Sequence, residues 1–308
     1  MMFTYEDFTK LGHKARVYGE VVIKGYSVRT NNTGMGRFIA GSLESKGTIP
    51  FKVWDSEPAF QTLMLEDYTG REVTISGEGN LFNGTMSVIV QTIKPAEEPV
   101  GKEAYFTSPY NVEDLKKRLQ HIVTNYLTEP AQRVFNMLWA GVKDRMLVEF
   151  AAVAHHDNCM HGLMAHTVKT ATLSAFFLKN YPTIAKREQD AIILGAIFHD
   201  VGKIWSYEWG YYSPKGRELT HNMLGAQYII KHRDAIVSEL GETTYNMLVS
   251  VIEQHHGEHG EPPRTLAAYI VHAADNLDAK LTDIESQLNA PIPSDMIKMD
   301  DWFLYTSI

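Results

Sequence analysis

A histidine and an aspartate stand side by side at the end of an apolar run, in "AIFHDVGK" at residues 196–203. The run "DAIILGAIFHD" is apolar nearly all round, which predicts a helix buried on every side, and Gly202 is expected to end it. A buried carboxylate is costly unless it meets a cation, a hydrogen-bond network or a metal. His199 and Asp200 therefore predict a metal or a strong polar network inside a helical core.

Other segments place metal-capable side chains at the ends or inner faces of predicted helices. A single histidine on an apolar helix face is more often a hydrogen-bonded core residue than a ligand. The concurrence of several such segments favours a metal site. Imidazoles and carboxylates without thiolates suit Mn, Fe, Mg or Zn in a hydrolytic site, where the metal lowers the pKa of a bound water. Five segments contribute: His166, His199 with Asp200, His221, His255 with His256, and Asp275.

The remaining polar candidates have plainer interpretations. Asp278 is expected to pair with Lys280 or with solvent. The tract "HHDNCMHG" at residues 155–162 has one cysteine among close histidines and lacks the spacing of a zinc finger, which favours a loop or a wall of the substrate site. Three histidines are expected to have ordinary structural roles: His232, His259 and His272.

Short strands with turn punctuation are predicted ahead of these helices. "TIPFKVWD" alternates Ile49, Phe51 and Val53 on one face, and Asn83-Gly84 suits a tight hairpin between "REVTISGEG" and "TMSVIVQTIK". One helix follows the third strand, which is the order of a five-stranded OB-type barrel. The sequence thus predicts an α+β multidomain chain: an OB-fold at 1–95, a linker at 96–110 rich in proline, and an all-α domain at 111–308 that begins at an N-cap, Asn111.

The composition narrows the possible binding partners of the protein and its cellular compartment. The 308 residues carry 29 Lys plus Arg against 37 Asp plus Glu, so the strongly basic footprint of a duplex-binding protein is absent. Contact with a nucleic acid would depend on stacking, for which Tyr26, Phe38, Phe51 and Trp54 are available on the barrel wherever they face outward. A single cysteine, Cys159, and the lack of a signal or spanning stretch favour a cytoplasmic protein with no membrane association.

The order His166, "HD" at 199–200 and Asp275 resembles the HD phosphohydrolase superfamily. Joined to "HHG" at 255–257 and "DNLDAK" at 275–280 after an OB-like barrel, it more specifically resembles the YhaM-type 3′-to-5′ exoribonucleases. The resemblance covers nearly the full length. The segments "HHDNCMHG" and "EHGEPPRT" depart from the usual forms of that family, and both are expected to border the substrate.

The resemblance implies the roles of the site residues. His166, His199, Asp200 and Asp275 would bind a first divalent metal, and His221, His255 and His256 would complete a second site, with Asp200 able to bridge. Asp200 and Asp275 would be catalytic together with Lys203, which either stabilises charge on a phosphate or is a surface lysine. Mn or Mg is the expected metal, with Fe, Co or Zn as alternatives. The implied reaction is 3′-to-5′ hydrolysis of single-stranded RNA, and of single-stranded DNA as a further substrate, to nucleoside 5′-monophosphates.

Two other functions stay open at this point. One is an HD-domain phosphohydrolase of small or cyclic nucleotides whose barrel serves assembly, and the acidic net charge of −8 favours it somewhat. The other is a non-catalytic nucleic-acid-binding adaptor that keeps the HD core only for folding. The sequence leaves open whether the chain forms a homo-oligomer.

Overall fold

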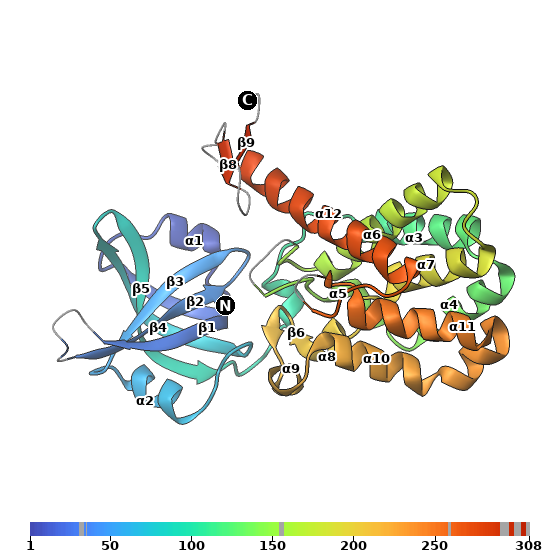
Figure 1. The fold of residues 1–308 in the computed structure, drawn as a ribbon. Coiled ribbons are helices and arrows are strands. Elements are labelled where there is room, and N and C mark those ends of the chain that lie inside the picture. Colours follow the sequence, from blue (N-terminus) through green and yellow to red (C-terminus); the bar gives the residue numbers. More distant parts are fainter. Residues whose placement is uncertain are drawn as a thin grey trace. The chain divides into compact units, whose positions relative to one another are not determined.

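The computed structural model describes residues 1–30, 34, 36–153, 157–257, 260–289, 296–298 and 303–305. The chain divides into two units, Met1–Thr107 and Ser108–Ile308 (Figure 1). The boundary falls within the segment predicted as the linker. That segment is partly structured, since it holds a short 3-10 helix at Lys102–Ala104 and the buried ring of Tyr105, whose carbonyl accepts a hydrogen bond from the Lys46 backbone N–H.

The first unit is a closed five-stranded barrel. Its strands are β1 (Arg16–Thr30), β2 (Arg37–Glu44), β3 (Thr48–Trp54), β4 (Glu72–Phe82) and β5 (Thr85–Pro95). They close in the order β1-β2-β3-β5-β4, with β3 and β5 parallel and the other pairs antiparallel. Helix α1 (Tyr5–Thr9) precedes β1, and α2 (Pro58–Leu65) lies between β3 and β4. This is the OB-type order, and the predicted fold class is confirmed.

Local sequence explains the barrel. Buried and half-buried residues alternate along β4, as period-2 strands require. Asn83 and Gly84 join β4 to β5 with φ of 49° and 77°, the two positive values that a type I′ turn needs. Phe51 is 1% exposed and lies in the barrel core. The predicted hairpin is therefore confirmed, and Phe51 is excluded from any surface role.

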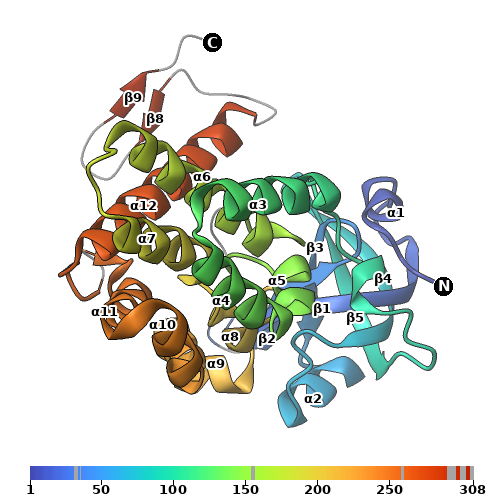
Figure 2. The same cartoon turned by 90° about the vertical axis from the view of Figure 1, so that its right-hand side faces the viewer.

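The second unit is helical. Its helices are α3 (Val112–Tyr126), α4 (Glu129–Ala140), α5 (Lys143–Val148), α6 (Gly162–Asn180), α7 (Lys186–Phe198), α8 (Lys203–Ser206), α9 (Pro214–Glu218), α10 (His221–Lys231), α11 (Arg233–Gln254) and α12 (Leu266–Leu288), seen from a second side in Figure 2. Asn111 caps α3 as predicted, because its side chain accepts from the backbone N–H groups of Glu113 and Asp114. No helix in the described ranges is long and apolar enough to cross a bilayer.

The unit also contains strands that the all-α prediction omitted. A two-stranded pair, β6 (Tyr207–Glu208) and β7 (Tyr211–Tyr212), turns at Trp209 and Gly210 with φ of 58° and 77°. A second pair is β8 (Met296–Lys298) with β9 (Phe303–Tyr305). Strands of two or three residues are too short to display an alternating pattern, so periodicity alone could not reveal them.

Helix α7 is the centre of this unit. Every residue from Asp190 to Phe198 is buried, and α7 packs against α6, α11 and α12. The prediction that Gly202 ends α7 is wrong. The helix ends at Phe198, and Gly202 has a φ of −64°, which any residue can adopt. A Cβ at Gly202 would lie 1.8 Å from the carbonyl oxygen of His221. Glycine is needed there because the start of α10 approaches the backbone closely.

Candidate active site

Four side-chain atoms converge at the inner end of α7, from α6, from α12 and from the two residues that directly follow α7. His166 from α6 points its Nε2 at Asp275 Oδ1 of α12 (3.0 Å), at His199 Nε2 (3.2 Å) and at Asp200 Oδ2 (3.4 Å). His199 Nε2 lies 3.2 Å from Asp200 Oδ2 and 3.8 Å from Asp275 Oδ1. We call these four residues the first cluster. The sequence placed each of them at a helix end or inner face, and the fold brings them together.

Hydrogen bonds at Nδ1 hold the imidazoles of His166, His199 and the nearby His255 in place. His199 Nδ1 donates to the Ala196 carbonyl at 2.9 Å, and His255 Nδ1 donates to the Ile252 carbonyl at 2.9 Å. His166 Nδ1 donates to Asp278 Oδ2 at 2.7 Å. A ring that donates from Nδ1 to an acceptor is free to present the Nε2 lone pair to a metal. The hydrogen bonds therefore set these rings in the orientation that metal ligation needs.

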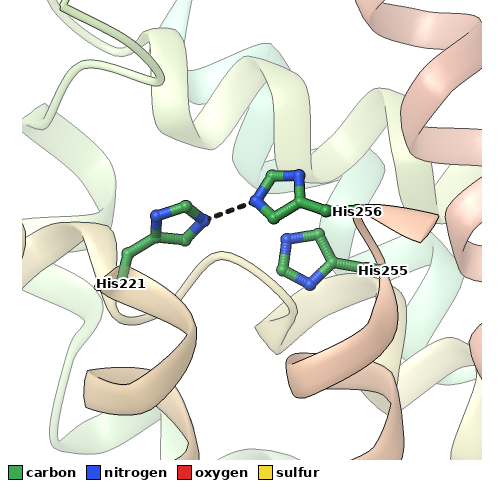
Figure 3. Close-up of side chains that lie close together, drawn as sticks. All are labelled: His221, His255 and His256. Atoms are coloured by element: carbon green, nitrogen blue, oxygen red, sulfur yellow. Dashed lines mark hydrogen bonds between the residues drawn. The ribbon is translucent and has the colours of Figure 1, made fainter. Parts of the chain in front are cut away.

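Three further histidines form a second cluster, which Figure 3 shows in close-up. His221 begins α10, and His255 and His256 follow the end of α11. His221 Nε2 and His256 Nε2 lie 2.9 Å apart. A ring nitrogen from each of the three residues lies within 4.8 Å of the others, close enough to hold one ion.

Asp200 lies between the two clusters. Its Oδ2 belongs to the first cluster, while Oδ1 lies 3.4 Å from His221 Nε2 and 3.7 Å from His255 Nε2. Asp200 Oδ1 and His255 Nε2 are buried and have no hydrogen-bond partner among the described residues. Buried acceptors without a donor are rare, and each carries a desolvation cost. This donor set fits divalent cations, which would satisfy both atoms at once.

The protonation states also suit metal ligands. Burial lowers the pKa of His221 to about 3 and holds that of His255 well below its usual value, so both rings are neutral near pH 7. Burial by itself would raise the pKa of Asp200, but Lys203 and the neighbouring imidazoles outweigh it and keep that pKa well below the usual range. The site therefore offers neutral imidazoles and an ionised carboxylate.

His166 differs from His221 and His255, because its pKa is raised rather than lowered. Burial opposes its protonation, but Asp200, Asp275 and Asp278 together hold the pKa of His166 well above the usual value. Burial likewise opposes ionisation of Asp275, and the His166 contact nonetheless keeps the pKa of Asp275 low. A cation taken up between them has to displace the proton that these carboxylates attract.

Lys203 is buried, so the interpretation of it as a surface lysine is wrong. It is 8% exposed, and its Nζ lies 2.6 Å from Asp200 Oδ2. Its charge thus offsets part of the negative charge at the first cluster. Whether it also contacts a phosphate stays a prediction.

A cavity of about 720 Å³ reaches the second cluster, since His221 and His256 are part of its wall. Arg217, Asn222 and Tyr212 are also in the wall. Three carboxylates join them, from Glu218, Glu253 and Glu261. The cavity therefore provides an approach to the second cluster with both cationic and acidic groups around it.

Asp278 has a different role from the one predicted. It is buried and accepts a hydrogen bond from His166, so the prediction that it pairs with Lys280 or with solvent is wrong. The signal was present in the sequence, because Asp278 follows Asp275 by three residues and so shares its side of the helix. His232 and His272 bind backbone carbonyls, as ordinary structural histidines do. The predictions for His155, His156 and His259 lie outside the described residues.

The barrel aromatics separate into two faces. Residues paired across strands point to the same side of a sheet, and Arg29, Phe38 and Trp54 are paired in one row across β1, β2 and β3. The rings of Phe38 and Trp54 lie 5.5 Å apart, and Trp54 is 41% exposed. Phe38 and Trp54 thus lie together on the outer face.

Tyr26 belongs to the other face. It is paired with Gly41, which is paired with the core residue Phe51. Its hydroxyl donates to the Leu63 and Glu66 carbonyls at 3.3 and 3.2 Å. The structure therefore corrects the prediction for Tyr26, whose ring packs against the barrel core and whose hydroxyl binds the chain around the end of α2.

The family model of the HD domain matches residues 163–280. The helical unit carries an HD domain. The match runs from α6 to α12 and so includes both clusters. An HD domain implies a divalent metal, and the two clusters are where this chain could bind one.

Two relatives extend the similarity beyond the HD domain. The chain is 25% identical over 297 residues to "3'-5' exoribonuclease YhaM" of Geobacillus sp. (strain WCH70), which covers 93% of this chain and 88% of the relative. It is 25% identical over 296 residues to the YhaM of Bacillus velezensis, covering 90% of each. Among solved structures, the second OB-fold domain of replication protein A from Methanococcus maripaludis matches 33% of this chain and 100% of that domain, with 14% identity and a TM-score of 0.25. The predicted resemblance to YhaM-type proteins is confirmed, and so is the prediction of an HD-domain hydrolase.

Proposed function

We propose that this HD-domain protein is a metal-dependent 3′-to-5′ exoribonuclease that hydrolyses single-stranded RNA to nucleoside 5′-monophosphates. The observation that carries the proposal is the placement of Asp200. Its two carboxylate oxygens face two separate ligand clusters, and Oδ1 has no hydrogen-bond donor among the described residues. A pair of cations sharing a carboxylate is the arrangement of many phosphodiester-cleaving enzymes. The similarity to YhaM proteins over about 90% of both chains supports the same activity.

The residues have separate tasks in this proposal. His166, His199, Asp200 and Asp275 would hold a first divalent cation, and His221, His255 and His256 would hold a second together with Asp200. Bound there, Mn²⁺ or Mg²⁺ would activate water and offset charge on the phosphate. Lys203 keeps Asp200 ionised by its contact at 2.6 Å. The hydrogen bonds at each Nδ1 keep the rings aimed at the clusters.

The outer face of the barrel is the proposed contact for the RNA strand. Phe38 and Trp54 offer stacking surfaces next to Arg29 in the same row. Lys52 lies over the ring of Phe82 at 5.7 Å, and that ring is 62% exposed. Aromatic rings interleaved with cations suit single strands of any sequence. Every base can stack on a ring, and every phosphate of the backbone can contact a cation.

The direction and products of cleavage test the proposal. Single-stranded RNA labelled at its 5′ end is expected to shorten as a ladder with Mn²⁺ or Mg²⁺. A blunt duplex is expected to resist, because unpairing a nucleotide costs a few kcal/mol and this acidic chain offers little compensating phosphate binding. Gel electrophoresis over time would show the ladder. Immediate release of the label as a mononucleotide would mean the opposite polarity, and a parallel DNA strand would show whether DNA is a substrate.

Stacking on the barrel is expected to account for part of the RNA affinity. Trp54→Ala should weaken binding by about 1–3 kcal/mol, which is roughly 5- to 150-fold. Tyr18→Ala is the matched control, since Tyr18 is 71% exposed but lies on the half of β1 paired with β4. Fluorescence anisotropy with EDTA present measures binding without hydrolysis. Equal losses in the two variants, or none in either, would remove the barrel face from the proposal.

A second function has one observation in its favour. Glu218, Glu253 and Glu261 line the cavity beside the second cluster, and acidic walls disfavour a polyanion more than a small phosphodiester. If small or cyclic nucleotides are hydrolysed and the RNA ladder does not form, the small-nucleotide phosphohydrolase replaces the exoribonuclease. If metal binds and neither substrate reacts, the non-catalytic adaptor remains.

A further inference from the structure

A buried polar network lies behind His166, at the ring edge that does not face the first cluster. Asp278 Oδ2 accepts from His166 Nδ1 at 2.7 Å, and Asp278 Oδ1 lies 3.8 Å from Lys169 Nζ. Lys169 also donates to both oxygens of Asp157, at 3.1 and 3.3 Å, and to Thr282 Oγ1 at 3.0 Å. The network joins α6 to α12, two helices that pack side by side.

The network continues to the start of the helical unit. The Tyr110 hydroxyl donates to Asp157, and the Tyr110 ring lies 5.4 Å from Lys169 Nζ. One aromatic ring, two carboxylates and the Thr282 hydroxyl thus lie around the ammonium of Lys169, which is partly buried. Asp157 and Asp278 are themselves buried.

The same oxygens could be mistaken for a third metal site. Single ligand atoms of Asp157, His166 and Asp278 lie within 4.8 Å of one another. However, the Lys169 ammonium already lies among them and donates to Asp157. The chain therefore provides its own cation there, and it leaves Asp278 available to His166.

We propose that Asp278 is a positioning residue for the first cluster: it fixes His166 with Nδ1 protonated and Nε2 directed at the metal, and Lys169 holds Asp278 in place. A carboxylate that accepts from the distal nitrogen of a ligating imidazole fixes the ring and strengthens it as a ligand, and its loss typically weakens metal binding about 10- to 100-fold. The inference rests on the metal assignment in the proposed function, but it does not depend on the substrate.

Manganese titration of the full chain tests this role. Asp278→Leu is expected to bind Mn²⁺ about 10- to 100-fold more weakly than the wild-type chain, because it removes the carboxylate that accepts from His166 Nδ1. Asp278→Asn should lie between the two, since its amide oxygen can still accept that hydrogen bond. Asp283→Asn is the matched control, because it removes the same charge from an exposed position on the same helix and should leave the affinity unchanged.

The readouts separate positioning from a merely structural role. Calorimetric titration gives affinity and stoichiometry, and circular dichroism gives Tm for each variant. A lower Tm with wild-type affinity in both Asp278 variants would overturn the proposal while leaving the metal assignment intact. If Asp278→Leu does not fold, Asp278→Asn decides, and wild-type affinity there overturns it. A wild-type chain that binds no Mn²⁺ would overturn this inference and the metal assignment together.

Discussion

Asp200→Asn is expected to abolish metal binding and hydrolysis together. The two Asp200 oxygens face different clusters, and an amide has one acceptor oxygen and no charge to offset a pair of cations. Metal ions supply several kcal/mol of charge stabilisation in such reactions, and about 1.4 kcal/mol is a factor of ten, so the rate should fall on the order of 10³-fold or more.

Metal analysis and the RNA ladder would be measured on the same preparation. Asp190→Asn is the control. Asp190, which lies on α7, is a buried carboxylate like Asp200, but it accepts from the backbone N–H and hydroxyl of Thr128, at 2.9 and 2.6 Å. That variant should lose stability and keep its metal. If Asp200→Asn retained wild-type activity, Asp200 could not be the shared ligand.

Gly202→Ala is expected to damage the fold and the second cluster at once. The new Cβ would lie 1.8 Å from the His221 carbonyl oxygen and 2.6 Å from the Gly225 backbone nitrogen. Both are backbone atoms, so α8 or α10 has to shift, and His221 moves with the start of α10. Overpacking costs typically about 1–3 kcal/mol, and a clash with backbone should fall at the upper end or beyond. The second metal should be lost before the first.

Denaturant unfolding and metal stoichiometry would check this result. Gly12→Ala is the control, because its nearest neighbour would be the Ala15 Cβ at 4.0 Å and the position is exposed. That change should be neutral or slightly stabilising, since alanine restricts the unfolded chain. A Gly202→Ala protein as stable as wild type, with a full complement of metal, would show that α10 tolerates displacement.

The sequence by itself determined the elements that rest on local chemistry, and most of the candidate residues. Turn and cap chemistry acts within a few residues, so Asn83-Gly84 and Asn111 could be assigned without the fold. The apolar run of α7 predicted a buried helix for the same local reason. The resemblance to HD-domain proteins then supplied an expected ligand set. What it could not supply was the distance between those ligands.

Only the tertiary structure decided how these elements meet. His166 and Asp278 are 112 residues apart, and their hydrogen bond exists because α6 and α12 pack together. The sequence predicted that Gly202 ends a helix. The structure shows instead that glycine is needed there because the start of α10 lies so close to it. Tyr26 lies after the register shift between Ile23 and Gly25, and such a shift changes which side chains face inward. Local patterns report what each segment can do, whereas packing between distant segments decides which groups touch.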